Sequence, residues 1–220
     1  MAAINFIQPL HRATKRNYDD RFAGANKTEC AAVAKRFEEE YFDGERKYGY
    51  GGYRYDGRWL AVAEAMVRHY DLQPGSRILD IGCAKGFLVH DFMKVLPAVD
   101  VVGLDISEYA VANAMPEVKG RVSAGDAVSL PYPDKTFDLV VSINTLHNLR
   151  LPELERALRE IERVGKKHKY IVMDSYRNES EKINLLSWQL TCECFFTPEE
   201  WDWVFSKCNY TGDYEFVYFE

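Results

Sequence analysis

The sequence predicts an α/β fold in which a doubly wound, mostly parallel sheet is flanked by helices. After the Pro74-Gly75 turn, short runs rich in valine, isoleucine and leucine alternate with stretches of helical periodicity. The runs are apolar at consecutive positions, which is typical of strands buried on both faces and joined by helical crossovers. We expect strands at 77–82, 99–106, 121–126, 137–144 and 169–176, and helices at 86–96, 107–115 and 151–165.

The residues before this core predict a helical addition. Residues 28–42 have apolar side chains four apart, with Thr28 as the expected N-cap, and residues 57–71 show a second helical stripe. Residues 47–58 are rich in glycine and tyrosine, and glycine loses too much conformational entropy to sustain a helix. We therefore expect residues 1–71 to supply N-terminal helices and a Tyr/Gly-rich lid.

The residues after the core predict three further elements. Residues 186–196 alternate in part between apolar and polar side chains, which favours a strand. Thr197 is the expected N-cap of a helix that has Pro198 in its first turn. The last run, 213–220, predicts a final strand.

The composition argues against several classes of protein. The net charge is −6, and acidic and basic residues are interspersed, whereas proteins that bind nucleic acid usually have a basic patch. No apolar run approaches the roughly 18 residues that span a bilayer, and the N-terminus has no secretory signal pattern. The five cysteines are irregularly spaced, which favours reduced thiols and a cytoplasmic location. Cys192 and Cys194 have no second pair beside them, so we expect no metal site.

A glycine-containing loop follows the first core strand, in the stretch from Asp80 to Gly86. In an open parallel sheet, ligands bind beyond the carboxyl ends of the strands, where glycine lets the backbone approach them closely. The next strand ends at Asp105, whose carboxylate is placed to accept hydrogen bonds from ribose hydroxyls. A dinucleotide site needs Gly-x-Gly-x-x-Gly, but counting from Gly82 the chain has Ala84 and Phe87 at the later positions. The pattern indicates a Rossmann-like domain for an adenosine-type ligand without a pyrophosphate.

Three segments resemble a known family. ILDIGCAKGF is similar to motif I of the class I S-adenosylmethionine-dependent methyltransferases, although Ala84 stands where that pattern has glycine. VVGLDIS resembles the second motif, and residues 124–142 resemble the third and fourth. The resemblance covers about residues 72–176. It implies one methyltransferase domain over residues 1–220, with this stretch as the cofactor-binding core and residues 177–220 on the substrate side.

The resemblance also implies which residues bind S-adenosylmethionine. Asp105 is expected at the ribose, Ile106 against the adenine and Asp126 at its exocyclic amine. The full expected set is Asp80, Gly82, Cys83, Ala84, Gly86, Asp105, Ile106, Asp126, Ala127 and Asn144.

Methyl transfer from a sulfonium depends mainly on proximity and orientation, and a base is needed only if the acceptor must lose a proton early. His147, just after the fourth strand, is the candidate base, because a neutral imidazole suits this role near pH 7. A histidine that only packs or holds the loop is the alternative. Tyr176 follows the fifth strand on the same rim and is a candidate for substrate binding.

The lid supplies the other candidates for substrate binding. Its aromatic rings are suited to excluding water and facing a sulfonium, and its arginines to binding a carboxylate or phosphate. The alternative is that the tyrosines only pack the N-terminal helices onto the sheet. The candidates are Tyr48, Tyr53, Arg54, Tyr55 and Arg58.

These observations favour methyl transfer to a small polar acceptor, such as a hydroxyl or amine of a sugar or natural product. Many enzymes that methylate amines of nucleic acids and proteins have an Asn/Asp-Pro-Pro-aromatic signature after the fourth strand. This chain has Asn144-Thr145-Leu146-His147 there. A protein or tRNA methyltransferase and a non-catalytic cofactor-binding subunit remain the alternatives, and the oligomeric state is open.

Overall fold

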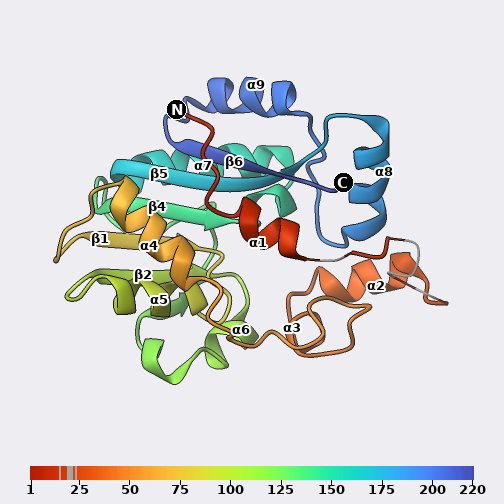
Figure 1. Ribbon diagram of the computed structural model, residues 1–220, viewed down its shortest axis with the longest axis horizontal. Coiled ribbons are helices and arrows are strands. Elements are labelled where there is room, and N and C mark those ends of the chain that lie inside the picture. Colours follow the sequence, from red (N-terminus) through yellow and green to blue (C-terminus); the bar gives the residue numbers. More distant parts are fainter. Residues whose placement is uncertain (15, 19–21, 23) are drawn as a thin grey trace.

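The computed structural model describes residues 1–14, 16–18, 22 and 24–220. Within them, six strands form one sheet in the order β3-β2-β1-β4-β5-β6, and every neighbouring pair is parallel (Figure 1). The chain winds outward from β1 in both directions, which confirms the predicted doubly wound α/β fold. The strands are β1 (Arg77–Ile81), β2 (Asp100–Asp105), β3 (Val122–Ala124), β4 (Phe137–Ile143), β5 (Gly165–Ser175) and β6 (Asp213–Tyr218).

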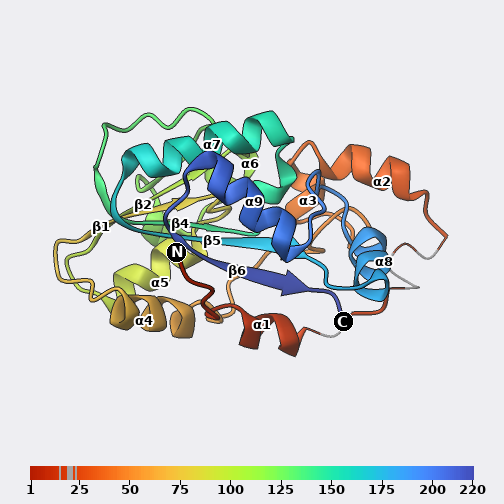
Figure 2. The same ribbon diagram turned by 90° about the horizontal axis from the view of Figure 1, so that it is seen from above.

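Helices cover both faces of the sheet. Figure 2 shows α1 (Gln8–Ala13), α4 (Leu60–His69) and α5 (Phe87–Val95) on one side, and α7 (Leu151–Val164) and α9 (Pro198–Cys208) on the other. The short helix α6 (Glu108–Ala112) follows β2, and the turn η1 (Pro116–Val118) precedes β3.

Alternating strand residues build two separate cores. Ile78 is buried with α4 and α5, whereas its neighbour Leu79 is buried with α7 and α9. The same alternation places Val141 in the first core and Val140 in the second. Since successive strand side chains point to opposite faces, a sheet covered on both sides needs apolar residues at every position. This explains the unbroken apolar runs of the sequence.

Glu215 on β6 anchors the N-terminal helix α1. Its buried carboxylate accepts hydrogen bonds from the backbone N–H groups of Phe6, Ile7 and Gln8 at 2.6 to 2.9 Å, and from the hydroxyl of Tyr170. The first N–H groups of a helix have no partner within the helix, and a negative charge there is favourable. The sequence gives no helical period for this short segment, and α1 was not predicted.

The predicted helix at 28–42 is wrong in its continuity. The structure has α2 (Lys27–Ala34) and α3 (Glu39–Phe42), separated at Phe37, whose φ of 53° cannot belong to a right-handed helix. The N-cap is Asn26, whose side chain accepts from the N–H of Thr28. The second predicted helix is confirmed as α4, with shorter ends.

The predicted strand at 186–196 is also wrong. The first of these residues end α8 (Glu179–Trp188), and the rest form an irregular segment leading to α9. Cys192 and Cys194 are both buried there, although they lie on no strand. The Thr197 cap is confirmed, because its side chain accepts from the N–H of Glu200. In Figure 1, α2, α3 and α8 gather beyond the carboxyl ends of the strands.

Candidate active site

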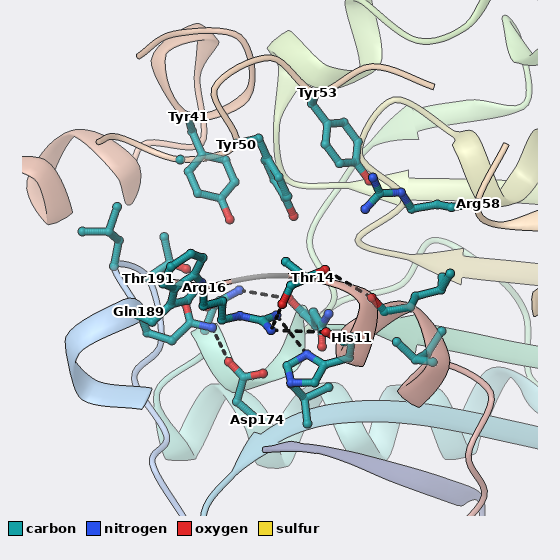
Figure 3. Close-up of a pocket in the computed structure, with 18 of the residues that line it drawn as sticks. His11, Thr14, Arg16, Tyr41, Tyr50, Tyr53, Arg58, Asp174, Gln189 and Thr191 are labelled. Carbon is teal, nitrogen blue, oxygen red and sulfur yellow. Dashed lines mark hydrogen bonds between the residues drawn. The ribbon is translucent and has the colours of Figure 1, made fainter. Parts of the chain in front are cut away.

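Two adjoining pockets lie at the carboxyl ends of the strands. The loop pocket, of about 250 Å³, is built around the loop after β1 and the ends of β2 and β4. The arginine pocket, of about 440 Å³, lies between the lid, α1 and the end of β5. Figure 3 shows Tyr41, Tyr50 and Tyr53 on one side of the arginine pocket and His11, Arg16 and Asp174 on the other. The wall shared by both pockets consists of Tyr41, Tyr50, Tyr53, Trp59, Asn144 and Asn148.

Two glycines shape the loop after β1. Gly82 has a φ of 78°, and a Cβ there would lie 2.0 Å from Oγ1 of Thr145. Gly86, at the start of α5, has a φ of 77°, and a Cβ would meet Val118 at 2.7 Å. Only glycine fits either position. Gly82 lines the loop pocket, whereas Gly86 lines neither pocket and fixes the turn into α5.

Asp105 and Asp80 place two buried carboxyl groups in the wall of the loop pocket. Oδ2 of Asp105 accepts from the N–H of Ala84 at 2.7 Å, and Oδ1 accepts from the N–H of Ser107 at 2.8 Å. Each carboxylate oxygen has two lone pairs, so both can accept a further hydrogen bond. Burial raises the pKa of Asp105 despite these bonds. Burial, together with the charge of Asp105, raises the pKa of Asp80 to about 7.

The other expected cofactor residues also line the loop pocket. Ile106 is 57% exposed, which is unusual for a large apolar side chain and leaves its face available to a flat apolar ligand. Asp126 is exposed, and its Oδ1 accepts from the N–H of Val128 at 3.0 Å in the turn that presents it. The remaining members are Cys83, Ala84, Ala127 and Asn144, and Asn144 reaches the arginine pocket as well.

His147 and Asp174 form a buried pair in the wall of the arginine pocket. His147 belongs to the turn η2 (Leu146–Asn148), and both side chains are 2% exposed. Nδ1 of His147 accepts from the backbone N–H of Asp174 at 3.2 Å, so the neutral ring carries its proton on Nε2. Nε2 lies 3.5 Å from Oδ2 of the same aspartate. In this arrangement the expected base has no lone pair directed at the pocket.

Asp43 ties the lid to the loop after β1. Its carboxylate pairs with Lys85 at 2.5 Å and accepts from the hydroxyl of Tyr109 at 2.7 Å. It also accepts from the N–H of Tyr53 in the lid at 3.1 Å. The ring of Tyr53 stacks on Phe87, with 4.7 Å between centroids and an angle of 13° between the planes. The lid therefore sits directly on the loop.

The structure brings only some of the substrate candidates to the site. Tyr53 lines both pockets, and Arg54 and Arg58 line the arginine pocket. The guanidinium of Arg58 pairs with both carboxylate oxygens of Asp56 at 2.5 to 3.0 Å, so its charge is already balanced.

Three substrate candidates line neither pocket. Tyr55 donates to Asp91 at 2.6 Å, Tyr48 packs with Cys30 and Leu190, and Tyr176 lies beside Lys182.

The sequence reasoning missed His11 and Arg16, which reach the arginine pocket from α1 and the residues after it. The sequence shows that this segment is basic, but nothing in its pattern placed it at the site.

A family model described as a methyltransferase domain matches residues 72–209. The chain belongs to this methyltransferase family.

Similar proteins act on different acceptors, according to their names. The methyltransferase is 33% identical over 137 residues to a sterol 24-C-methyltransferase of Gibberella zeae, covering 56% of this chain and 35% of that protein. It is 36% identical over 123 residues to a demethylmenaquinone methyltransferase of Symbiobacterium thermophilum, covering 50% and 46%. The matched stretch therefore spans less than half the length of either relative.

Solved structures support the fold. The YcgJ protein of Bacillus subtilis superimposes with a TM-score of 0.53 at 22% identity, covering 66% of each chain. A methyltransferase-like protein of Bacillus halodurans gives a TM-score of 0.54 at 19% identity, covering 66% of this chain and 67% of that one. In the described part of this chain, no helix is both long and apolar enough to cross a membrane.

Proposed function

We propose that this methyltransferase transfers the methyl group of S-adenosylmethionine to a small polar acceptor bound in the arginine pocket. The shared wall of the two pockets is the observation that supports this most strongly. A cofactor in the loop pocket and an acceptor in the arginine pocket would meet at Asn144 and the lid tyrosines. Holding two reactants in this way supplies most of what methyl transfer needs from a protein.

The loop pocket fits an adenosine-type cofactor. The backbone of Gly82 lines the pocket without a side chain, and the oxygens of Asp105 keep lone pairs for ribose hydroxyls. Ile106 offers an apolar face for adenine, and Asp126 also lines the pocket. S-adenosylmethionine would supply the electrophilic methyl group here.

The arginine pocket fits a small molecule, because about 440 Å³ lies within the usual range for such sites. Its polar lining suits a hydroxyl or amine acceptor of a sugar or natural product. We propose His147 and Asp174 as the pair that controls proton transfer. The geometry favours Asp174 as the group that faces the acceptor and His147 as the group that orients it.

The thiols suit a reducing compartment, and we infer a cytoplasmic location from them. All five cysteines are free and buried. Such thiols are typical of proteins that are kept reduced.

Incubation with isotopically labelled S-adenosylmethionine and separate fractions of metabolites, tRNA and protein tests the proposal. We expect the label in the metabolite fraction and a raised melting temperature with S-adenosylhomocysteine, since a ligand that binds only the folded state stabilises it. NAD, which carries a pyrophosphate, should give no such shift. Label in tRNA or protein would overturn the small-acceptor proposal, and stabilisation by NAD alone would overturn the cofactor.

A further inference from the structure

Arg16 places a guanidinium group in the arginine pocket, and no carboxylate of the described residues forms an ion pair with it. Figure 3 shows it between His11 and Asp174. Its guanidinium carbon lies 5.2 Å from the ring centroid of Phe219 and 5.5 Å from that of Trp188. The ion pairs formed among the described residues do not include Arg16.

His11 fixes the orientation of this guanidinium. Nε2 of His11 lies 2.6 Å from the carbonyl oxygen of Tyr218, which can only accept, so Nε2 carries the ring proton. Nδ1 of His11 therefore keeps its lone pair and accepts from Nη2 of Arg16 at 3.0 Å. Nη1 of Arg16 donates at 3.3 Å to the carbonyl oxygen of His11 and at 3.4 Å to that of Thr14. Both Nη atoms of the guanidinium therefore already donate hydrogen bonds to residues of α1 and the residue after it.

The edge of the same guanidinium that carries Nε is not used in these hydrogen bonds. Nε of Arg16 is buried and has no hydrogen-bond partner among the residues that the structure describes. Together with the outer hydrogen on Nη2, it forms a planar two-donor edge that matches the two oxygens of a carboxylate or phosphate. A buried donor without a partner is unfavourable, so a ligand that supplies the acceptor gains binding energy.

Other arginines lie in the same pocket as Arg16. Arg46 packs on the same indole of Trp188, with its guanidinium carbon 5.3 Å from the ring centroid, and Arg54 lines the pocket. Burial lowers the pKa of Arg16, the charges of Tyr18 and Asp174 raise it, and the charge of Arg46 lowers it, so Arg46 is close enough to repel Arg16.

The acids in this wall are already engaged by neighbours. Asp56 is paired with Arg58. Asp174 binds Gln189 and lies next to His147. The described residues that line the pocket include more arginines than acids, which in a chain of net charge −6 indicates an anionic ligand.

We propose that the methyl acceptor carries a carboxylate or phosphate group that binds the Nε edge of Arg16, with His11 as the residue that positions the guanidinium. The inference rests on the proposed function and adds the chemical class of the acceptor. The acceptor then has two ends: an anionic group at Arg16, and a hydroxyl or amine directed to the wall shared with the loop pocket. Neutral sugars and other uncharged molecules are thereby excluded as acceptors.

Calorimetric titration with sodium phosphate and with sodium acetate tests the binding step, using the full chain and its variants Arg16→Gln, Arg16→Lys and Arg12→Gln. Arg12 lies on α1 and is exposed outside the arginine pocket, so Arg12→Gln removes the same charge from the same segment. We expect Arg16→Gln to weaken anion binding about 10- to 100-fold, the loss that charge-assisted hydrogen bonds predict. Arg16→Lys should recover only part of the affinity, because it keeps the charge without the planar edge. Arg12→Gln should bind as the wild type does.

The two anions distinguish the two sources of the negative group. Binding of phosphate alone assigns a phosphorylated acceptor, and binding of acetate alone assigns a carboxylate. Equal affinity of the wild type and Arg16→Gln for both anions would overturn the inference.

Titration with S-adenosylhomocysteine separates this result from the proposed function. Its affinity should be unchanged in Arg16→Gln, which also shows that the variant is folded. If the wild type does not bind S-adenosylhomocysteine, the proposed function is contradicted, whether or not the anions bind. Labelled products of the methylation assay that contain neither a carboxylate nor a phosphate group, as determined by mass spectrometry, would contradict the anionic acceptor while leaving methyl transfer intact.

Discussion

One aspartate engages both ring nitrogens of His147. The backbone N–H of Asp174 donates to Nδ1 at 3.2 Å, and Oδ2 of its carboxylate lies 3.5 Å from Nε2. Burial lowers the pKa of His147 below its ordinary value of 6.5, although the charge of Asp174 opposes this. A neutral ring held from both sides orients a carboxylate well but has no free lone pair for a proton from the acceptor.

We therefore expect His147→Gln and Asp174→Asn to differ in turnover. Asp174→Asn removes the carboxylate in the pocket wall, so it should lower turnover by roughly 10²- to 10⁴-fold if a base is used. His147→Gln should lower turnover by only about tenfold, because it relaxes the orientation of Asp174 but keeps its carboxylate. Steady-state kinetics with the identified acceptor checks the ranking. The reverse ranking would restore His147 as the base.

The same pKa shift predicts how stability depends on pH. His147 binds a proton more readily in the unfolded chain, near pH 6.5, than in the folded one. The unfolded state therefore gains protons first, and the free energy of unfolding should fall as pH drops below about 6.5. Denaturant unfolding at several pH values measures the slope, and His147→Gln should flatten it. An unchanged slope in that variant would show that other groups dominate.

The sequence predicted the core because its signals are local. Each buried strand is indicated by consecutive apolar residues. The loop at Gly82 directly follows one strand, and Asp105 ends the next. The wall around Arg16 had no such signal. The helix α1 buries no residue of its own, and its position depends on Glu215, which lies 207 to 209 residues away in the chain. No local pattern predicted the left-handed backbone conformation of Phe37, which prevents α2 from continuing into α3.

Asp105→Asn is expected to weaken cofactor binding while leaving the fold intact. The amide keeps one oxygen for a backbone N–H, but it loses the charge and one acceptor. The loss should be roughly 1.5–3 kcal/mol, the usual contribution of a hydrogen bond to a charged group. Asp105→Ala would also strip the partners of Ala84 and Ser107, so the amide is the cleaner change. Calorimetry with S-adenosylhomocysteine that gives wild-type affinity would remove Asp105 from the cofactor site.

Asp43→Asn should loosen the lid. Burial opposes its ionisation, yet hydrogen bonds from Lys85 and Tyr109 lower the pKa of Asp43, so its charge contributes to holding residues 47–58. Loss of one charge-assisted hydrogen bond predicts about tenfold faster amide hydrogen exchange there, with the sheet unchanged. Glu40→Gln, which changes an exposed acid on α3 that forms no ion pair among the described residues, is the matched control. Equal exchange in both variants would show that the stacked tyrosines hold the lid without Asp43.

Glu215 links the stability of the fold to the acceptor site. Its carboxylate holds the first N–H groups of α1, and α1 brings His11 and Arg16 to the arginine pocket. Glu215→Gln removes the charge and one acceptor at a position that is 2% exposed, and should lower the free energy of unfolding by about 1.5–3 kcal/mol. The free end of α1 should then raise KM for the acceptor more than it lowers kcat, because α1 brings His11 and Arg16 to the acceptor and contributes no residue to the loop pocket. Glu155→Gln, an exposed acid on α7, controls for the loss of charge. Denaturant unfolding and steady-state kinetics measure the two effects, and a destabilised Glu215→Gln with unchanged KM would show that α1 does not set the acceptor site.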